Sequence, residues 1–364
     1  MGTASRLGLA VACALAAVPP APAQPADVAA RDAAGRAIAR IAGQLDAHPL
    51  VMVGELYRSR EIHAFLQRML RDPAFVCRLD DVVVEFGNAR LQAVADAYVS
   101  GKGVSEPQLR SVWRETLPPL TWNSPVYREF YETVREVNGR RLCGHPIRVP
   151  LGDPPIDWSK VTTAAEFARF DDRDRYYAGV VEREVLAKGR RALLVAGELH
   201  AMKRPPDSLR GAPDEAETAE ILEQRHPGAL FSIVTVPLPE GAAALGMGAP
   251  PSFRAVRGSE LERADFQLAD WDSTVTRATV GGRETWRVQP AKHWPRMGEV
   301  VDGLLHLGGN HSIAAPAEIY LDPAYQEEFR RRARIIRSYS GQDFMPAIDG
   351  LVRQAVELDR ARRR

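Results

Sequence analysis

Three carboxylates and one histidine follow apolar segments that are typical of buried strands. They are Glu55 after residues 50–53, Glu85 after 82–84, Asp153 after 142–151 and His200 after 192–196. The carboxyl ends of parallel strands lie at one edge of a sheet, where α/β proteins place their ligands, so we expect these side chains to meet there. Together they could bind a metal ion that activates water, or one of them could act as a general base.

The predicted site has a catalytic part and a ligand-binding part. The predicted catalytic residues are Glu55, Glu85, His200 and Arg173, and the first three are also the predicted metal ligands. The predicted ligand-binding residues are Tyr57, Arg58, Asp153 and Asp174. An arginine at this edge, either Arg58 or Arg173, could stabilise an oxyanion or hold a substrate carboxylate.

The acidic residues also have a purely structural interpretation. Glu55 and Glu198 could be first-turn acids of the helices that follow them, where the helix dipole favours a negative charge. Glu85 comes directly after buried valines, so its carboxylate needs a partner, and a structural salt bridge to Arg173 or Arg58 would provide one.

The histidines and Asp174 have structural alternatives as well. His200 could be a hydrogen-bonded structural histidine, and Asp174 a charge on the face of a helix. His63 and His306 are interpreted as packing or surface residues.

The hydrophobic pattern predicts an α/β protein with a mainly parallel sheet flanked by helices. Strands are expected at residues 50–53, 82–84, 142–151, 192–196, 230–236 and about 300–308. Amphipathic helical patterns lie between them, and the one that begins at Ser59 or Arg60 spaces its apolar residues at helical intervals. Residues 101–141 contain helical patterns separated by prolines, which predicts a helical insertion that forms a lid over the sheet.

Composition, charge and cysteine content narrow the class of protein. The chain has 364 residues and a net charge of +1, which gives no electrostatic case for nucleic-acid binding. Arg6, the apolar run 7–18 and a cleavage site after Ala23 predict a signal peptide, and therefore a periplasmic or secreted protein. No later run is long enough for a transmembrane helix. The two remaining cysteines, Cys77 and Cys143, could pair in an oxidising compartment or be isolated thiols.

Four short motifs occur in an order that resembles a known superfamily. They are Gly54-Glu55-Leu56-Tyr57 followed by Glu61, Val82-Val83-Val84-Glu85-Phe86-Gly87-Asn88, Arg173-Asp174 with Tyr177-Ala178, and Gly197-Glu198-Leu199-His200. This order resembles the erythromycin esterase-like, ChaN-like haem-uptake and TraB/Tiki proteins. Segments 134–138 and 151–158 resemble a bacterial ChaN-like branch of unassigned activity. The resemblance covers about residues 48–310 and implies an α/β core with a helical subdomain and a site at the strand ends.

The resemblance also implies roles for individual residues. Glu55 and Glu85 match the family glutamates, and His200 matches the histidine of the second Gly-x-x-His motif. Tyr57 stands where the first motif has histidine. A tyrosine is a poor general base near neutral pH because its pKa is about 10, although a phenolate can ligate ferric haem. Among the relatives, the esterase-like proteins hydrolyse an ester, the Tiki-like proteins are metal-dependent proteases and the ChaN-like proteins bind haem.

Two functional hypotheses follow. The first is an exported hydrolase of an ester or amide, acting on a small-molecule or peptide ligand with a divalent metal of the Mn or Co type or with His200 as base. The second is a binding protein for haem or a similar ligand, contacted by Tyr57 or His200. The expected organisation is a signal peptide (1–23), a linker and helix (24–47), an α/β domain (48–322) with a helical insertion at about 101–141, and a basic helical tail (323–364).

Overall fold

The computed structural model describes residues 25–206, 216–237, 239–266, 273–280, 283–290 and 294–363. The predicted signal peptide and its cleavage site after Ala23 lie outside these residues. Among the described helices, none is both long enough and apolar enough to cross a membrane.

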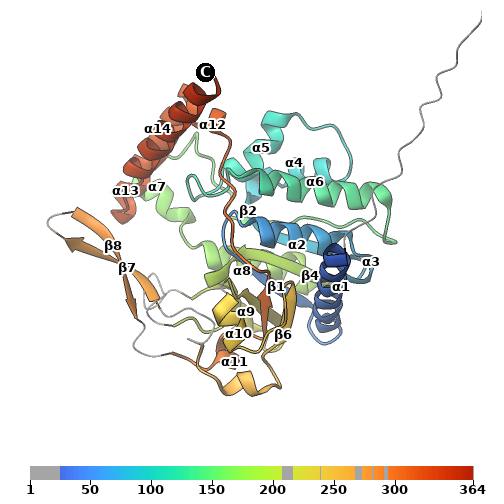
Figure 1. The fold of residues 1–364 in the computed structure, drawn as a ribbon. Helices are drawn as coiled ribbons and strands as arrows, with labels where there is room; N and C mark the ends of the chain where they lie inside the picture. Colours follow the sequence, from blue (N-terminus) through green and yellow to red (C-terminus); the bar gives the residue numbers. More distant parts are fainter. Residues whose placement is uncertain are drawn as a thin grey trace, which may run out of the picture.

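A seven-stranded sheet forms the centre of the molecule (Figure 1). In spatial order its strands are β3 (Leu151–Asp153), β2 (Asp81–Asn88), β4 (Ala192–Gly197), β1 (Leu50–Glu55), β5 (Leu230–Thr235), β9 (Gly303–His306) and β6 (Ser252–Ala255). The first six run parallel to one another, and β6 pairs antiparallel with β9. The prediction of an α/β fold with a mainly parallel sheet is therefore confirmed. A separate hairpin pairs β7 (Ser273–Val280) with β8 (Arg283–Pro290).

The central position of β1 explains why its sequence is apolar almost throughout. All six of its residues are buried, and both of its faces are covered. Val51 belongs to the hydrophobic core on one face of the sheet and Met52 to the core on the other, as the alternation of side chains along a strand requires. Its register with β4 sets Glu55 opposite Gly197, so the two Gly-Glu motifs of the sequence end side by side.

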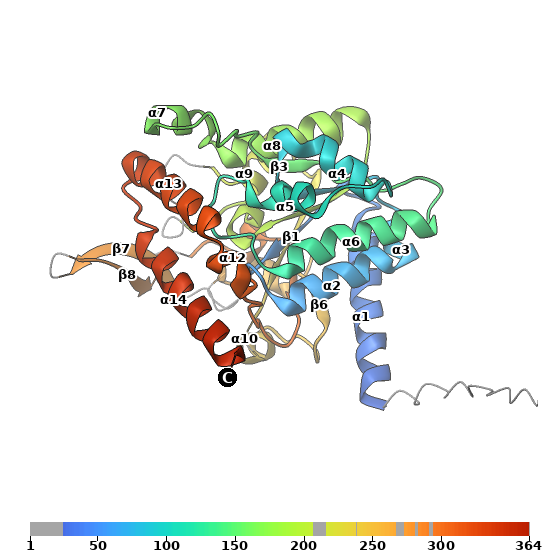
Figure 2. The same cartoon turned by 90° about the horizontal axis from the view of Figure 1, so that it is seen from above.

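Helices cover both faces of this sheet (Figure 2). One face carries α1 (Pro25–Gln44), α2 (Arg60–Arg71), α3 (Pro73–Val76), α4 (Gln92–Val99), α5 (Glu106–Arg114) and α6 (Pro125–Arg140). The other face carries α8 (Arg173–Glu184), α9 (Thr218–Arg225), α10 (Pro239–Ala244) and α11 (Met297–Val300). The two helical patterns expected within 101–141 are α5 and α6, which pack on α4 and α2 respectively.

Two details of the sheet differ from the prediction. The third strand was expected over residues 142–151, but β3 begins only at Leu151. Pro146 and Pro150 lack the N–H group that would donate a hydrogen bond to a neighbouring strand. In addition, Cys143 forms a disulfide bond with Cys77, which lies at the end of α3. The edge strand β6 was not predicted, because it has only four residues, of which Phe253 alone is buried, and this gives no clear alternation.

The helices near the C-terminus pack together with α7 beside the carboxyl edge of the sheet. The group comprises α7 (Ala164–Phe167), α12 (Ala317–Leu321), α13 (Pro323–Ser340) and α14 (Met345–Arg362). Residues 308–316, which we call the crossing segment, lead from β9 to α12 past the end of β1 (Figure 1). Backbone hydrogen bonds fix this crossing, from Arg60 N–H to the His311 carbonyl at 2.9 Å and from Ile313 N–H to the Arg58 carbonyl at 2.8 Å.

The structure pairs Cys77 with Cys143 in a disulfide across 66 residues of sequence. Of the two alternatives left open by the sequence, paired or isolated thiols, the structure supports pairing.

Candidate functional site

Glu85 and Arg173 form the centre of the site. Glu85 follows the valines of β2 and is buried; one carboxylate oxygen is paired with the Arg173 guanidinium, and the other accepts the Gly197 N–H at 2.7 Å. Burial alone would raise the pKa of Glu85, but the charges of His200 and Arg173 outweigh this effect and hold the pKa at about 2. Glu85 therefore stays ionised, and its two oxygens fix the positions of Arg173 and of the β4 end.

Asp153 supports Arg173 from the neighbouring strand. It is the last residue of β3, and its Oδ1 accepts from Arg173 Nε at 3.2 Å while its Oδ2 accepts from the Leu117 N–H at 2.8 Å. Burial raises the pKa of Asp153 to about 7, against the opposing effect of Arg173. Because both oxygens are engaged and the residue is buried, Asp153 positions Arg173 rather than facing the cleft.

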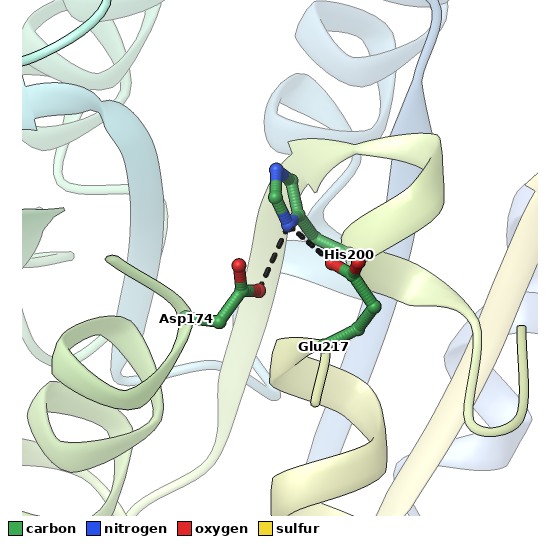
Figure 3. A group of neighbouring side chains, drawn as sticks. All are labelled: Asp174, His200 and Glu217. Carbon is green, nitrogen blue, oxygen red and sulfur yellow. Dashed lines mark hydrogen bonds and ion pairs between the residues drawn. The ribbon is translucent and has the colours of Figure 1, made fainter. Parts of the chain in front are cut away.

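His200 lies within a group of carboxylates (Figure 3). It follows β4 on a short 3₁₀ turn, Glu198–Ala201. Its Nδ1 lies 2.8 Å from Asp174 Oδ1 and 2.8 Å from Glu217 Oε2, and its Nε2 lies 3.4 Å from Glu85 Oε1. Burial would lower the pKa of His200, but the charges of Asp174 and Glu85 raise it well above its usual value. Without another cation at Nδ1, His200 is protonated near neutral pH and cannot accept a proton as a general base.

The carboxylates around His200 come from the first turns of two helices. Asp174 is the second residue of α8, and Glu217 is the N-cap residue of α9. Thr218 fixes Asp174, since its N–H and its hydroxyl both donate to Asp174 Oδ1 at 2.7 Å. Burial would raise the pKa of Asp174, but the charge of His200 lowers it to about 2.

Glu55 takes part in a different pair. Its Oε2 lies 2.7 Å from Nε2 of His63 on α2, and both side chains are buried. Burial raises the pKa of Glu55, although His63 opposes this effect. His63 is thus buried, as a packing residue would be, but it is also the hydrogen-bond partner of a predicted catalytic acid. Glu55 Oε1 and His63 Nδ1 have no partner among the described residues.

Tyr57 lies between these two groups. Its ring meets Trp122 edge to face at a centroid distance of 4.9 Å, and its hydroxyl lies against Gly197. Tyr57 as a whole is 39% exposed, but the burial of its phenol end against the site and the charge of Glu85 raise the pKa of Tyr57. The phenol therefore stays protonated and can donate a hydrogen bond.

Arg58 is directed elsewhere. Its side chain lines a groove together with Tyr320 of α12 and Leu358 of α14, whereas the cleft beside His200 is lined by Arg173. The two arginines predicted at this edge of the sheet therefore line two different cavities: Arg173 lines the cleft beside His200, and Arg58 lines the groove beside α12 and α14.

The cleft of the candidate site is small. Glu85, Arg173, Asp174, His200 and Thr218 line it, and its cavity volume is only about 10 Å³. This is less than the roughly 300–1,000 Å³ of most small-molecule pockets.

The donor set around His200 fits a divalent metal ion. Asp174, His200 and Glu217 each offer one ligand atom, and these atoms all lie within 4.8 Å of one another. Three protein ligands of nitrogen and carboxylate type, with further positions left for water, are typical of catalytic sites for zinc and similar ions. This group shares only His200 with the predicted metal ligands. Glu85 lies beside the group, and Glu55 is engaged with His63.

Haem fits the same residues poorly. Tyr57, the predicted iron ligand, does not line the cleft beside His200. The cleft beside His200 is also far too small for a porphyrin.

Sequence reasoning missed Glu217 and Thr218. They follow a polar stretch of sequence, residues 203–215, and neither comes directly after a strand. The one usable signal was their place at the start of an apolar helical pattern, where acids and threonines are common for purely structural reasons.

Comparisons with known proteins extend this description. No family model matches the sequence, and no curated protein matches it significantly. A solved structure of a mutant of erythromycin esterase EreC, in its open conformation, has a TM-score of 0.52, with 76% of this chain and 94% of that chain covered at 11% identity. This chain has the erythromycin esterase fold. The similarity to this hydrolase is one of fold, because the two sequences share so few residues.

Other solved structures are more distant. A succinoglycan biosynthesis protein is 11% identical over 78% of this chain and 98% of its own, with a TM-score of 0.47. A protein from Bacillus cereus is 10% identical over 75% and 91%, also with a TM-score of 0.47.

Proposed function

We propose that this protein is a metal-assisted hydrolase of an ester or amide, with its reaction centre in the cleft between Arg173 and His200. The observation that carries the proposal is the approach of two carboxylate oxygens to a single imidazole nitrogen, each at 2.8 Å. One proton on Nδ1 cannot make two strong hydrogen bonds, whereas a divalent cation bound by Asp174, His200 and Glu217 would satisfy all three groups. Such an ion would supply an activated water and polarise a carbonyl oxygen.

The protein's own residues have separate tasks in this scheme. Arg173 is held on two sides, by Glu85 and by Asp153, so its positive charge is fixed in the wall of the cleft. A fixed charge of this kind stabilises an oxyanion without reorganising during the reaction. The protonated Tyr57 hydroxyl lies against Gly197 at the end of β4, and it could serve as a second donor.

The high pKa of His200 separates this scheme from the simpler one in which His200 is the base. A general base must be unprotonated near the working pH, and the carboxylates around His200 favour the protonated ring. The metal-assisted version has no such conflict, because His200 would hold a cation at Nδ1 in place of the proton.

We further propose that the protein is exported. The apolar N-terminal run with its cleavage site, and the pairing of Cys77 with Cys143, both favour an oxidising compartment.

Metal analysis and kinetics together test the hydrolase proposal. Protein purified without chelator is analysed for bound metals, and its hydrolysis of a panel of nitrophenyl esters and peptide anilides is measured with and without Mn²⁺, Co²⁺ or Zn²⁺. Asp174→Asn and Glu217→Gln should each weaken metal binding at least about tenfold and lower kcat. Glu240→Gln, which changes a surface acid of α10, should alter neither. Activity that is unaffected by chelators and by both variants would contradict the proposal.

A further inference from the structure

A second candidate binding site lies against the outer side of α8. It is a cavity of about 430 Å³, which is within the usual range for small-molecule pockets. The side of α8 that carries Tyr176 and Arg183 lines this cavity, whereas the side that carries Arg173 and Tyr177 lines the cleft beside His200. With 3.6 residues per turn, these two sides of the helix face in nearly opposite directions. The cavity is therefore separate from the proposed reaction centre.

The apolar walls of this cavity are anchored in the protein. Pro154 directly follows β3 and is buried, and Phe170 and Tyr176 are half-buried. Phe170 packs against the hydrophobic core beside α7 and α13, and Tyr176 packs against the core beneath α8. Two aromatic rings and a proline ring thus offer apolar surface that is already held in place. Little side-chain entropy would be lost there when a ligand binds.

Positive charge dominates the polar part of the cavity. Its lining includes three arginines, Arg169, Arg175 and Arg183, and a single carboxylate, that of Asp172. This carboxylate is already paired, because Arg175 Nε donates to Asp172 Oδ2 at 2.6 Å. Within the part of the chain that the structure describes, neither Arg169 nor Arg183 forms an ion pair. The lining therefore has an excess of two positive charges, although the whole chain has a net charge of only +1.

Two of the three arginines are positioned without a ligand. Arg183 lies over the Tyr176 ring, with its guanidinium carbon 5.9 Å from the ring centroid, which is a cation–π contact. A guanidinium that lies over a ring can still donate from its N–H groups to an anion. Arg175 is held by Asp172, the N-cap residue of α8. A concave wall with fixed positive charges favours a small anion.

We propose that this cavity binds an organic phosphate monoester whose organic part is flat or apolar. A phosphate monoester carries a charge of about −1.5 to −2 near neutral pH, which matches the excess charge of the lining. A single carboxylate would neutralise only half of this excess. Arg169 and Arg183 would hold the phosphate oxygens, and the rings of Phe170 and Tyr176 would contact the organic part. The inference concerns binding alone and does not depend on the proposed hydrolysis.

Calorimetric titration with four defined probes tests the proposal. The full-length protein is titrated with phenyl phosphate, inorganic phosphate, benzoate and phenol, with EDTA present so that no metal ion at His200 can hold the phosphate. Phenyl phosphate should bind at least about tenfold more tightly than each of the others, because only it combines a dianion with an apolar ring. Absence of binding would overturn the proposal. Equal affinity for benzoate would overturn the phosphate assignment, and equal affinity for inorganic phosphate would overturn the role of the rings.

Variants of exposed arginines locate the binding. Arg169→Gln and Arg183→Gln should each weaken binding of phenyl phosphate about 10- to 100-fold, the range expected for losing a charge-assisted hydrogen bond. Both side chains are exposed, so these changes should affect stability little. The matched control is Arg36→Gln, which changes an exposed arginine of α1 on the other face of the sheet and should leave the affinity unchanged. Unchanged affinity in both cavity variants, or an equal loss in the control, would overturn the assignment to this cavity.

Discussion

The phenol of Tyr57 lies directly against Gly197. The Tyr57 ring therefore connects the segment Gly54–Tyr57 with the segment Gly197–His200. A β-carbon built on Gly197 would collide with the Tyr57 hydroxyl oxygen and would lie 2.7 Å from its Cζ. Only a glycine leaves room for the ring at this point. Tyr57 of the first Gly-Glu motif and Gly197 of the second are therefore sterically matched.

Gly197→Ala should displace the Tyr57 ring and destabilise the protein by about 1–3 kcal/mol, the usual cost of overpacking. Urea unfolding measures the loss, and the fluorescence of Trp122, which contacts the ring, should report the displacement. In a Tyr57→Ala background the same glycine substitution should cost much less, because the clash is gone. Equal costs in both backgrounds would mean that the two residues are not in contact.

Glu198→Gln should be nearly neutral at low pH and increasingly favourable as the pH rises. Burial raises the pKa of Glu198 from 4.5 to about 8, and its Oε1 accepts from the N–H and the hydroxyl of Thr235 at 2.5 Å. Between these two pKa values the folded protein keeps a proton that the unfolded chain releases. Wild-type stability therefore falls with rising pH by up to about 1.4 kcal/mol per pH unit. The glutamine has no proton to lose, so unfolding free energies measured across this window should diverge in its favour.

Removing one member of the Glu55–His63 pair should cost more than removing both. His63→Leu leaves the Glu55 carboxylate buried without its partner at 2.7 Å, and breaking a buried pair in this way costs about 3–5 kcal/mol. A double-mutant cycle with Glu55→Leu measures the coupling. Additive losses in the double variant would contradict a paired role.

The disulfide should contribute substantially to stability. It closes a loop across 66 residues, and the chain-entropy model assigns about 4 kcal/mol to a loop of this length. The double variant Cys77→Ser, Cys143→Ser should therefore have a free energy of unfolding about 4 kcal/mol lower than that of the wild type. Dithiothreitol should reproduce the loss in the wild type and leave the double variant unchanged, which would attribute the effect to this bond.

The sheet was predictable because buried parallel strands leave a strong local signal. The apolar runs at 50–53, 82–84 and 192–196 are long enough to stand out, and the structure places a strand at each. The strand expected at 142–151 was mostly wrong because its apolar residues pack around a disulfide and two prolines, and apolar content alone does not distinguish such a loop from a strand. β6 was missed because it is four residues long and only half buried.

The site was predictable only where its residues follow strands. Glu85 and His200 do, and the structure brings them to 3.4 Å from each other. Glu217 reaches His200 from a helix N-terminus that the sequence connects to the sheet through a long polar segment, so no spacing rule links the two. The orientation of Arg58 also could not be foreseen, because its left-handed backbone, with a φ of +65°, depends on Tyr127 and Ile313, which are distant in the chain.

The central place of β1 has a consequence for the order of folding. Its two neighbours in the sheet are β4 and β5, which end at Gly197 and Thr235, and the crossing segment that fixes its end lies beyond residue 307. β1 therefore cannot pair until residues 192–197 are present, and it has both neighbours only when residues 230–233 have followed. Contacts so distant in sequence form slowly, so the end of β1 and the side chains around it reach their final places only after the crossing segment has docked.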